Sequence, residues 1–206
     1  MGLILVLGCE TAKKPLALPY FNGPEFNPEW ISMHSPNYAK IHTIPPFSFL
    51  DQDGKTITEK TVDGKIYVAN FIFTRCISIC PKMTENMGHL QNLFKNDSSV
   101  LFLSHSVTPK WDSVPILKRY AERKGVISGK WHLLTGNQDS IYKIAKKQYF
   151  AGDSVGYYGE EKDFLHTEHF ILIDRKRRIR GIYNGTLSLE MERLADDIRN
   201  LEKEDN

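Results

Sequence analysis

Residues 65–94 read KIYVANFIFTRCISICPKMTENMGHLQNLF, and this stretch decides the fold. Its first nine residues are rich in β-branched and aromatic side chains, with apolar groups on both faces, which is typical of a strand buried at the centre of a sheet. After residue 81 the apolar side chains recur at helical spacing, at Met83, Met87, Leu90 and Phe94. A strand that leads into a helix places the turn between them at the carboxyl edge of the sheet, where α/β proteins hold their chemistry. Cys76 and Cys80 lie in that turn.

The rest of the chain repeats this alternation. An Asp-Gly pair at residues 53–54, between short β-rich pieces, predicts a hairpin ahead of the central strand. The expected order then continues with strand 99–107, helix 112–125, strand 130–136, helix 139–150, a strand, charged turn and strand over 169–185, and helix 189–204. This order predicts an α/β protein whose sheet is partly parallel, carries helices on its faces and closes with an antiparallel hairpin. The layout is a thioredoxin-like fold with an N-terminal extension and β-hairpin insertions.

Length and charge limit the function classes. The chain has 206 residues, enough for one domain with a substantial core. Its formal net charge of +2 excludes strong non-specific nucleic-acid binding as its main role. We expect a lipoprotein signal remnant over residues 1–9, a proline-rich tether and N-terminal arm over residues 10–39, and the folded domain over residues 40–206.

The sequence VLGC at residues 6–9 ends a short apolar run and looks like the lipobox of bacterial lipoproteins, in which cleavage leaves the cysteine lipidated. The run is too short to span a bilayer, and N-myristoylation would need Ser or Thr where Val6 stands. An incidental cysteine in a frayed apolar terminus is the alternative. We expect Cys9 to carry a lipid that anchors the chain to a bacterial membrane on its extracytoplasmic, periplasmic side.

The cysteine pair is one residue wider than the Cys-x-x-Cys spacing of common thiol–disulfide enzymes. Pro81 favours a helix start at Cys80, so the free N–H groups and positive end of that helix should lower the cysteine pKa. Two thiolates on a preformed loop provide half of a soft-metal site. Structural zinc would need four protein ligands, and the domain contains no further cysteine, so a site that adds one histidine fits copper better. Inert core cysteines and a plain disulfide are the alternatives.

A histidine could complete such a site. His166 and His169 lie just before the strand of residues 169–185, on a loop that could fold over the cysteine edge. His105, at the end of a central strand, could also approach the cysteines. The remaining histidines are expected in other places: His34 and His42 in the arm, His89 on a solvent-facing side of its helix, and His132 packed within a short strand.

Four segments carry a resemblance to a known family. FIFTRCISICPKM, KWHLLTG, DFLHTEHFILID and PPFSFLDQDGKTIT closely resemble the Sco/SenC family of copper-binding proteins, and the likeness covers about residues 40–202. It implies a thioredoxin-like fold that binds Cu(I) or Cu(II) through both cysteines and a distal histidine, and a role in assembling the copper A centre of cytochrome c oxidase. Carried over by position, the implied ligands are Cys76, Cys80 and His166, because Phe170 opens the next strand. His169 would then be an accessory ligand or pack against the hairpin.

The sequence departs from the family pattern after its second buried strand. The family usually carries a Ser-Val-Asp-Pro-like element there, whereas this chain has Thr108 in place of the acid. Because the usual carboxylate is missing, the sequence leaves open which side chain orients the metal ligands and contacts a partner at this edge of the sheet. Asp112 is a candidate to supply the carboxylate from a shifted position.

Three functions fit a reactive cysteine pair on this fold. The first is a copper metallochaperone, not an enzyme, whose partner would be subunit II of cytochrome c oxidase or another copper enzyme. The second is a thiol–disulfide oxidoreductase that keeps the cysteines of the copper A site reduced. The third is a peroxidase, which needs one low-pKa cysteine and no metal. The distal histidine and the wide cysteine spacing favour the metallochaperone.

The turn RKRR at residues 175–178, with Arg180 beyond it, concentrates positive charge. A solvated hairpin turn is the simpler expectation. A dock for an acidic partner surface or for anionic lipid is the alternative.

Overall fold

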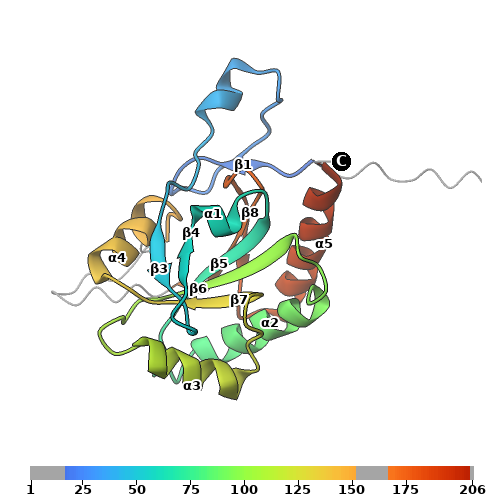
Figure 1. The fold of residues 1–206 in the computed structure, drawn as a ribbon. Helices are drawn as coiled ribbons and strands as arrows, with labels where there is room; N and C mark the ends of the chain where they lie inside the picture. Colours follow the sequence, from blue (N-terminus) through green and yellow to red (C-terminus); the bar gives the residue numbers. More distant parts are fainter. Residues whose placement is uncertain (1–16, 152–166, 205–206) are drawn as a thin grey trace, which may run out of the picture.

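The computed structural model describes residues 17–151 and 167–204, which fold around a five-stranded sheet of order β7-β6-β5-β8-β9 (Figure 1). Its strands are β5 (Ile66–Ile72), β6 (Val100–Ser106), β7 (Trp131–Leu134), β8 (His169–Ile173) and β9 (Ile179–Asn184). The first three run parallel, whereas β8 is antiparallel to β5 and to β9. The predicted partly parallel sheet and its closing hairpin are therefore confirmed.

Helices and a hairpin cover both faces of the sheet. One face packs against α2 (Cys80–Leu93), α3 (Val114–Lys124) and α5 (Ser188–Glu204). The other packs against α4 (Gln138–Lys147), α1 (Glu59–Val62) and the hairpin of β3 (Ser48–Leu50) and β4 (Thr56–Thr58). Because side chains alternate along a strand, Val68 of β5 enters the first layer and its neighbour Tyr67 the second.

Two glycines end elements where the sequence predicts. Gly125 adopts a left-handed conformation with φ of 67° and stops α3 after Lys124. Gly54 has φ of 74° in the turn between β3 and β4, at the Asp-Gly pair. A bridge between Leu50 and Thr135 joins this hairpin to the end of β7. No helix within the described residues is long and apolar enough to cross a membrane.

The arm contains more regular structure than its sequence suggests. Two-residue strands β1 (Tyr20–Phe21) and β2 (Pro28–Glu29) pair antiparallel, and η1 (Pro36–Lys40) is a 3₁₀ helix. Figure 1 shows this segment at the end of the molecule opposite α3. Such short pieces carry no readable periodicity, so the sequence alone could not indicate them.

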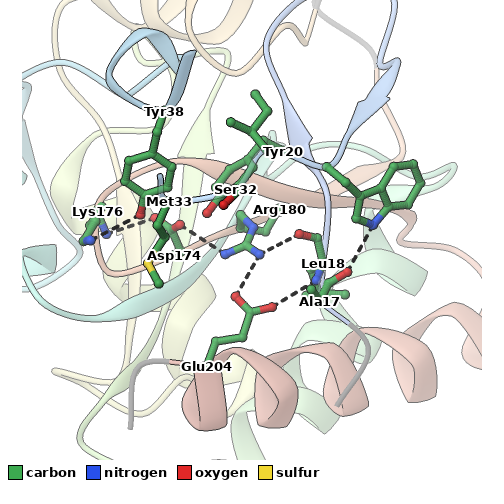
Figure 2. Close-up of a pocket in the computed structure, with 12 residues that line it drawn as sticks. Ala17, Leu18, Tyr20, Ser32, Met33, Tyr38, Asp174, Lys176, Arg180 and Glu204 are labelled. Atoms are coloured by element: carbon green, nitrogen blue, oxygen red, sulfur yellow. Dashed lines mark hydrogen bonds and ion pairs between the residues drawn. The ribbon is translucent and has the colours of Figure 1, made fainter. Parts of the chain in front are cut away.

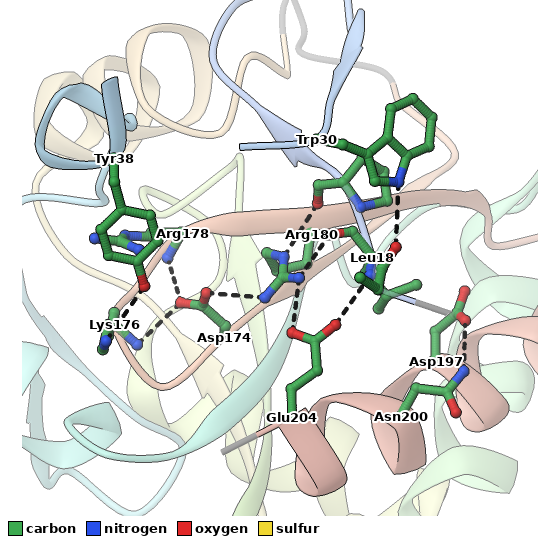
Figure 3. A network of polar contacts seen from close by, with 12 residues as sticks. Leu18, Trp30, Tyr38, Asp174, Lys176, Arg178, Arg180, Asp197, Asn200 and Glu204 are labelled. Carbon is green, nitrogen blue, oxygen red and sulfur yellow. Dashed lines mark hydrogen bonds and ion pairs between the residues drawn. The ribbon is translucent and has the colours of Figure 1, made fainter. Parts of the chain in front are cut away.

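Arg180, a buried arginine, connects the N-terminal arm to the domain through hydrogen bonds and ion pairs. Arg180 of β9 is 5% exposed and donates to the carbonyl oxygens of Leu18 (2.6 Å) and Pro19 (3.1 Å). Its guanidinium also pairs with Asp174 at 3.4 Å and with Glu204 at 2.8 Å. Glu204 in turn accepts a hydrogen bond from the Leu18 N–H (Figure 3). The same residues line a cavity of about 410 Å³ under the arm, and its charged groups already face one another (Figure 2).

The basic turn between β8 and β9 also contacts the arm. The guanidinium of Arg178 lies 4.1 Å from the ring centroid of Tyr38, and Lys176 donates to the hydroxyl of the same tyrosine. Arg177, with φ of 60°, donates through its side chain to the carbonyl oxygen of Ile44. Lys176 is exposed, as a solvated turn predicts, whereas Arg177 and Arg178 are partly buried and hold residues 38–44 against the domain.

Candidate metal centre

The cysteines lie where β5 passes into α2, as predicted. β5 ends at Ile72 and α2 begins at Cys80, with Pro81 in its first turn. In the intervening loop the Cys76 N–H donates to the carbonyl oxygen of Phe73 at 3.2 Å. Cys76 is half-buried, whereas Cys80 is 4% exposed, and both are free thiols. The pair therefore offers one accessible sulfur and one sulfur sheltered behind it.

The two thiols ionise differently. Burial opposes ionisation of Cys76, but hydrogen bonds from the Cys80 backbone and thiol, and from the Ser78 and Ile79 backbones, lower its pKa overall. For Cys80 burial dominates and, with the nearby Cys76, raises the pKa to about 12. The expectation that the helix start lowers the cysteine pKa thus holds for Cys76 and is wrong for Cys80. The physical reason is that the N–H groups of Ser78, Ile79 and Cys80, at and just before the start of α2, point at the Cys76 sulfur, whereas the helix buries its own first residue, Cys80.

A buried carboxylate braces the loop in front of Cys76. Asp112 is fully buried and accepts hydrogen bonds from the backbone N–H of Thr74 (3.1 Å) and from its hydroxyl (2.6 Å). The hydroxyls of Ser106 (2.6 Å) and Thr108 (3.0 Å) donate to the same carboxylate. Thr108, which replaces the family's usual acid, is thus part of a network centred on Asp112. The sequence made Asp112 a candidate, but nothing in it identified Thr74 and Ser106 as partners.

His166 and the proposed lipidation site Cys9 lie outside the described residues. Within residues 17–151 and 167–204, no three His, Cys, Asp or Glu side chains gather as a metal site. The assignment of His166 therefore stays a prediction.

The described histidines have other partners. The ring of His169 packs edge-on against Phe26 of the arm, with centroids 5.6 Å apart. His132 lies within β7 with its Nδ1 2.9 Å from Asp51, and His42 contacts the carbonyl oxygen of Gln148. His89 is exposed on α2, as predicted. None of these contacts involves a cysteine.

His105 faces away from the cysteine helix. Its side chain belongs to the layer formed with β3 and α4, and its ring stacks on Phe71 with centroids 5.4 Å apart. Phe49 and Tyr149 enclose it at 5.5 and 5.6 Å. The idea that His105 approaches the cysteines is wrong, because odd-numbered residues of β6 point to the face opposite α2.

The donor set that the structure does show suits a soft metal. Thiolates bind copper and zinc, and two sulfurs on one loop can approach the same ion. Cys76 is partly accessible and inclined to ionise, so an ion could reach it from solvent. These residues fit copper as a cargo.

Comparison with known proteins places the chain in a family. Residues 36–203 match the family model described as SCO1/SenC. A SCO1/SenC family lipoprotein from Bacillus anthracis str. Ames is 31% identical with a TM-score of 0.68, and the alignment covers 78% of this chain and 95% of that one. BsSco is a member of the Sco family of cytochrome c oxidase assembly proteins whose structure was solved with the identification of a disulfide switch. It is 29% identical with a TM-score of 0.65, over 78% of this chain and 94% of that one.

A copper-bound relative matches over a similar length. Arabidopsis thaliana ScoI with copper bound is 26% identical with a TM-score of 0.59, over 77% of this chain and 98% of that one. These likenesses confirm the predicted thioredoxin-like fold. The turn from β5 to α2 with its two cysteines, the sheet around it and the match over residues 36–203 lead to one conclusion: the chain belongs to the SCO1/SenC family.

Proposed function

We propose that this protein is a copper metallochaperone for assembly of the copper A centre of cytochrome c oxidase, with Cys76, Cys80 and His166 as the copper ligands. The observation that carries the proposal is the pair of free thiols at the start of α2, one half-buried and one sheltered. The copper-bound relative and the oxidase-assembly relative support it. The partner is subunit II of the oxidase or another copper enzyme.

The two thiols have different tasks in this mechanism. Cys76, whose pKa is lowered, supplies a thiolate that meets the incoming ion first. Cys80 must release its proton as the second sulfur binds, so copper uptake releases protons and weakens as pH falls. Copper supplies a soft Lewis-acid centre that exchanges ligands readily. Delivery follows when soft ligands of the partner replace the accessible Cys76 before the sheltered Cys80.

Replacing His166 tests the ligand set. The His166→Ala protein is expected to bind Cu(II) about 100-fold more weakly, because the ion loses one of its three proposed ligands. For scale, the complete ligand set of a zinc-finger peptide contributes about 10–16 kcal/mol, and one neutral ligand supplies a minor share of such a total. Competitive titration measures the affinity, and thiolate-to-copper absorption reports the change in ligands. His169→Ala is the matched control, since its ring packs against Phe26, and it should keep both. Equal loss in the two variants, or none in His166→Ala, would contradict the assignment.

A thiol–disulfide role is the second candidate, favoured by the unequal pKa values of the pair. The Cys76 thiolate would attack a partner disulfide to form a mixed disulfide. Cys80, after losing its proton, would displace the partner, leaving a Cys76–Cys80 disulfide and a reduced partner dithiol. Unchanged reduction of an oxidase-subunit disulfide by His166→Ala would favour this role over copper delivery.

We also propose that Cys9 is lipidated and holds the protein at the extracytoplasmic face of a bacterial membrane; the B. anthracis relative is described as a lipoprotein. In a bacterial host, Cys9→Ser is expected to move most of the protein from the membrane fraction to the soluble fraction. Immunoblots of both fractions measure this, with Cys76→Ser as the control that should stay with the membrane. Membrane retention of Cys9→Ser would rule the anchor out.

A further inference from the structure

We propose that Asp112 is a positioning residue for Cys76: through Thr74 it fixes the loop that carries this sulfur at the distance from Cys80 that chelation and disulfide formation require. The inference rests on the proposed role of the cysteine pair. It assigns to Asp112 a task separate from binding metal, since its carboxylate is occupied by hydrogen bonds.

The carboxylate grips Thr74 at two points. Oδ2 accepts from the Thr74 N–H and Oδ1 from the Thr74 hydroxyl, so both the backbone and the side chain of this residue are held. A single contact would let the loop pivot, whereas two contacts to opposite oxygens also restrict its rotation. Thr74 is separated from Cys76 only by Arg75, so this restraint acts on the sulfur-bearing residue at short range.

Asp112 is itself attached to the sheet from which the loop departs. Its carboxylate accepts from Ser106 at the end of β6, and its backbone N–H donates to the carbonyl oxygen of Thr108 at 2.9 Å. Ser106 pairs with Ile72, the last residue of β5, and the Val107 N–H donates to Ile72 at 2.9 Å. The loop is therefore braced against the rigid edge of its own strand.

Trp111, next to Asp112 in the chain, adds a second contact to the clamp, by which we mean the two hydrogen bonds between Asp112 and Thr74. The Arg75 guanidinium lies 4.4 Å from the ring centroid of Trp111. Consecutive residues 111 and 112 thus hold consecutive residues 75 and 74. Cys80, in contrast, is set by the start of α2 and by its own burial. Of the two cysteines, Cys76 lies outside the helix, so the separation of the two sulfurs depends on the loop that carries Cys76. Asp112 restrains this loop.

Loss of the clamp should lower the effective concentration of one sulfur at the other. In the full chain, Asp112→Asn keeps the shape of the side chain but turns an amide toward donors that need an acceptor. Copper affinity is expected to fall about 10–100-fold, as for other residues that orient metal ligands. In the metal-free protein, the equilibrium constant for forming the Cys76–Cys80 disulfide against oxidised dithiothreitol should fall about threefold or more. In that exchange the two thiols pass two electrons and two protons to the dithiothreitol disulfide.

Asp51→Asn is the matched control. Asp51 lies in the β3–β4 turn, away from the cysteines, and is equally buried. It accepts from two backbone N–H groups and contacts His132 of β7. It should lower the melting temperature without changing copper affinity or the disulfide equilibrium. Equal effects of the two variants on these readouts would overturn the inference, and so would wild-type values in a folded Asp112→Asn protein.

Thr74→Val separates positioning from a general charge effect. If Asp112 acts through Thr74, the double variant should be no worse than Asp112→Asn alone, whereas additive losses would contradict the inference. If wild-type protein binds no copper, the proposed function fails. The disulfide equilibrium still tests Asp112, because it needs no metal.

Discussion

Arg180→Met is expected to lower the free energy of unfolding by about 3–5 kcal/mol, the range for breaking a buried ion pair by removing one partner. Methionine fills much of the space but leaves Asp174 buried without its cation and two arm carbonyls without a donor. The arm should detach before the domain unfolds, because Leu18, Pro19 and Glu204 meet at this side chain. Urea unfolding gives the stability, and limited proteolysis within residues 18–40 reports release of the arm.

Two further variants isolate the cause. Arg193→Met removes an exposed i,i+3 pair with Glu190 on α5 and should cost less than about 1 kcal/mol. Adding Asp174→Asn to Arg180→Met should recover part of the loss, because no unpaired charge then stays buried. If Arg180→Met were as mild as Arg193→Met, the arginine would not be the anchor of the arm.

The fold could be predicted because its signals are local. The short apolar run of residues 65–73, rich in β-branched and aromatic side chains, is typical of a buried strand, and the helical spacing after Pro81 leads directly to α2. The arm could not be predicted, since its structure depends on contacts across the chain. Arg180 and Leu18 are 162 positions apart, and a charged hairpin reads in sequence as a solvent-facing feature.

The site divides in the same way. The positions of Cys76 and Cys80 follow from strand and helix boundaries, which the sequence contains. Their opposite pKa shifts depend on how deeply each sulfur is buried and on which sulfur the N–H groups of residues 78–80 reach, and both are three-dimensional properties. The role of Asp112 was hidden for a related reason. Its partner Thr74 precedes it by 38 residues and becomes its neighbour only because β5 and β6 end at the same edge.

His105 is expected to make the protein sensitive to acid. Its ring is fully buried among aromatic side chains, both ring nitrogens lack hydrogen-bond partners, and burial lowers its pKa from 6.5 to about 3. At a pH between these two pKa values, His105 takes up a proton in the unfolded chain but not in the folded chain. The contribution of neutral His105 to the free energy of unfolding is therefore complete above pH 6.5 and is lost as pH falls toward 3. From pH 7.5 to pH 5 the loss should be about 2 kcal/mol, and by pH 3 it should be about 4 kcal/mol.

His105→Phe separates this effect from the other titrating groups. Phenylalanine keeps an aromatic ring among Phe49, Phe71 and Tyr149 but cannot take up a proton. The variant should therefore lose about 2 kcal/mol less than wild type between pH 7.5 and pH 5 in urea unfolding. His89→Gln serves as the control, because this exposed ring contacts water in both the folded and the unfolded chain, and it should follow the wild-type curve. Parallel curves for wild type and His105→Phe would mean that the buried imidazole finds a proton or a partner in the folded protein. In that case the aromatic layer opposite the cysteine helix would be more open to water than its packing indicates.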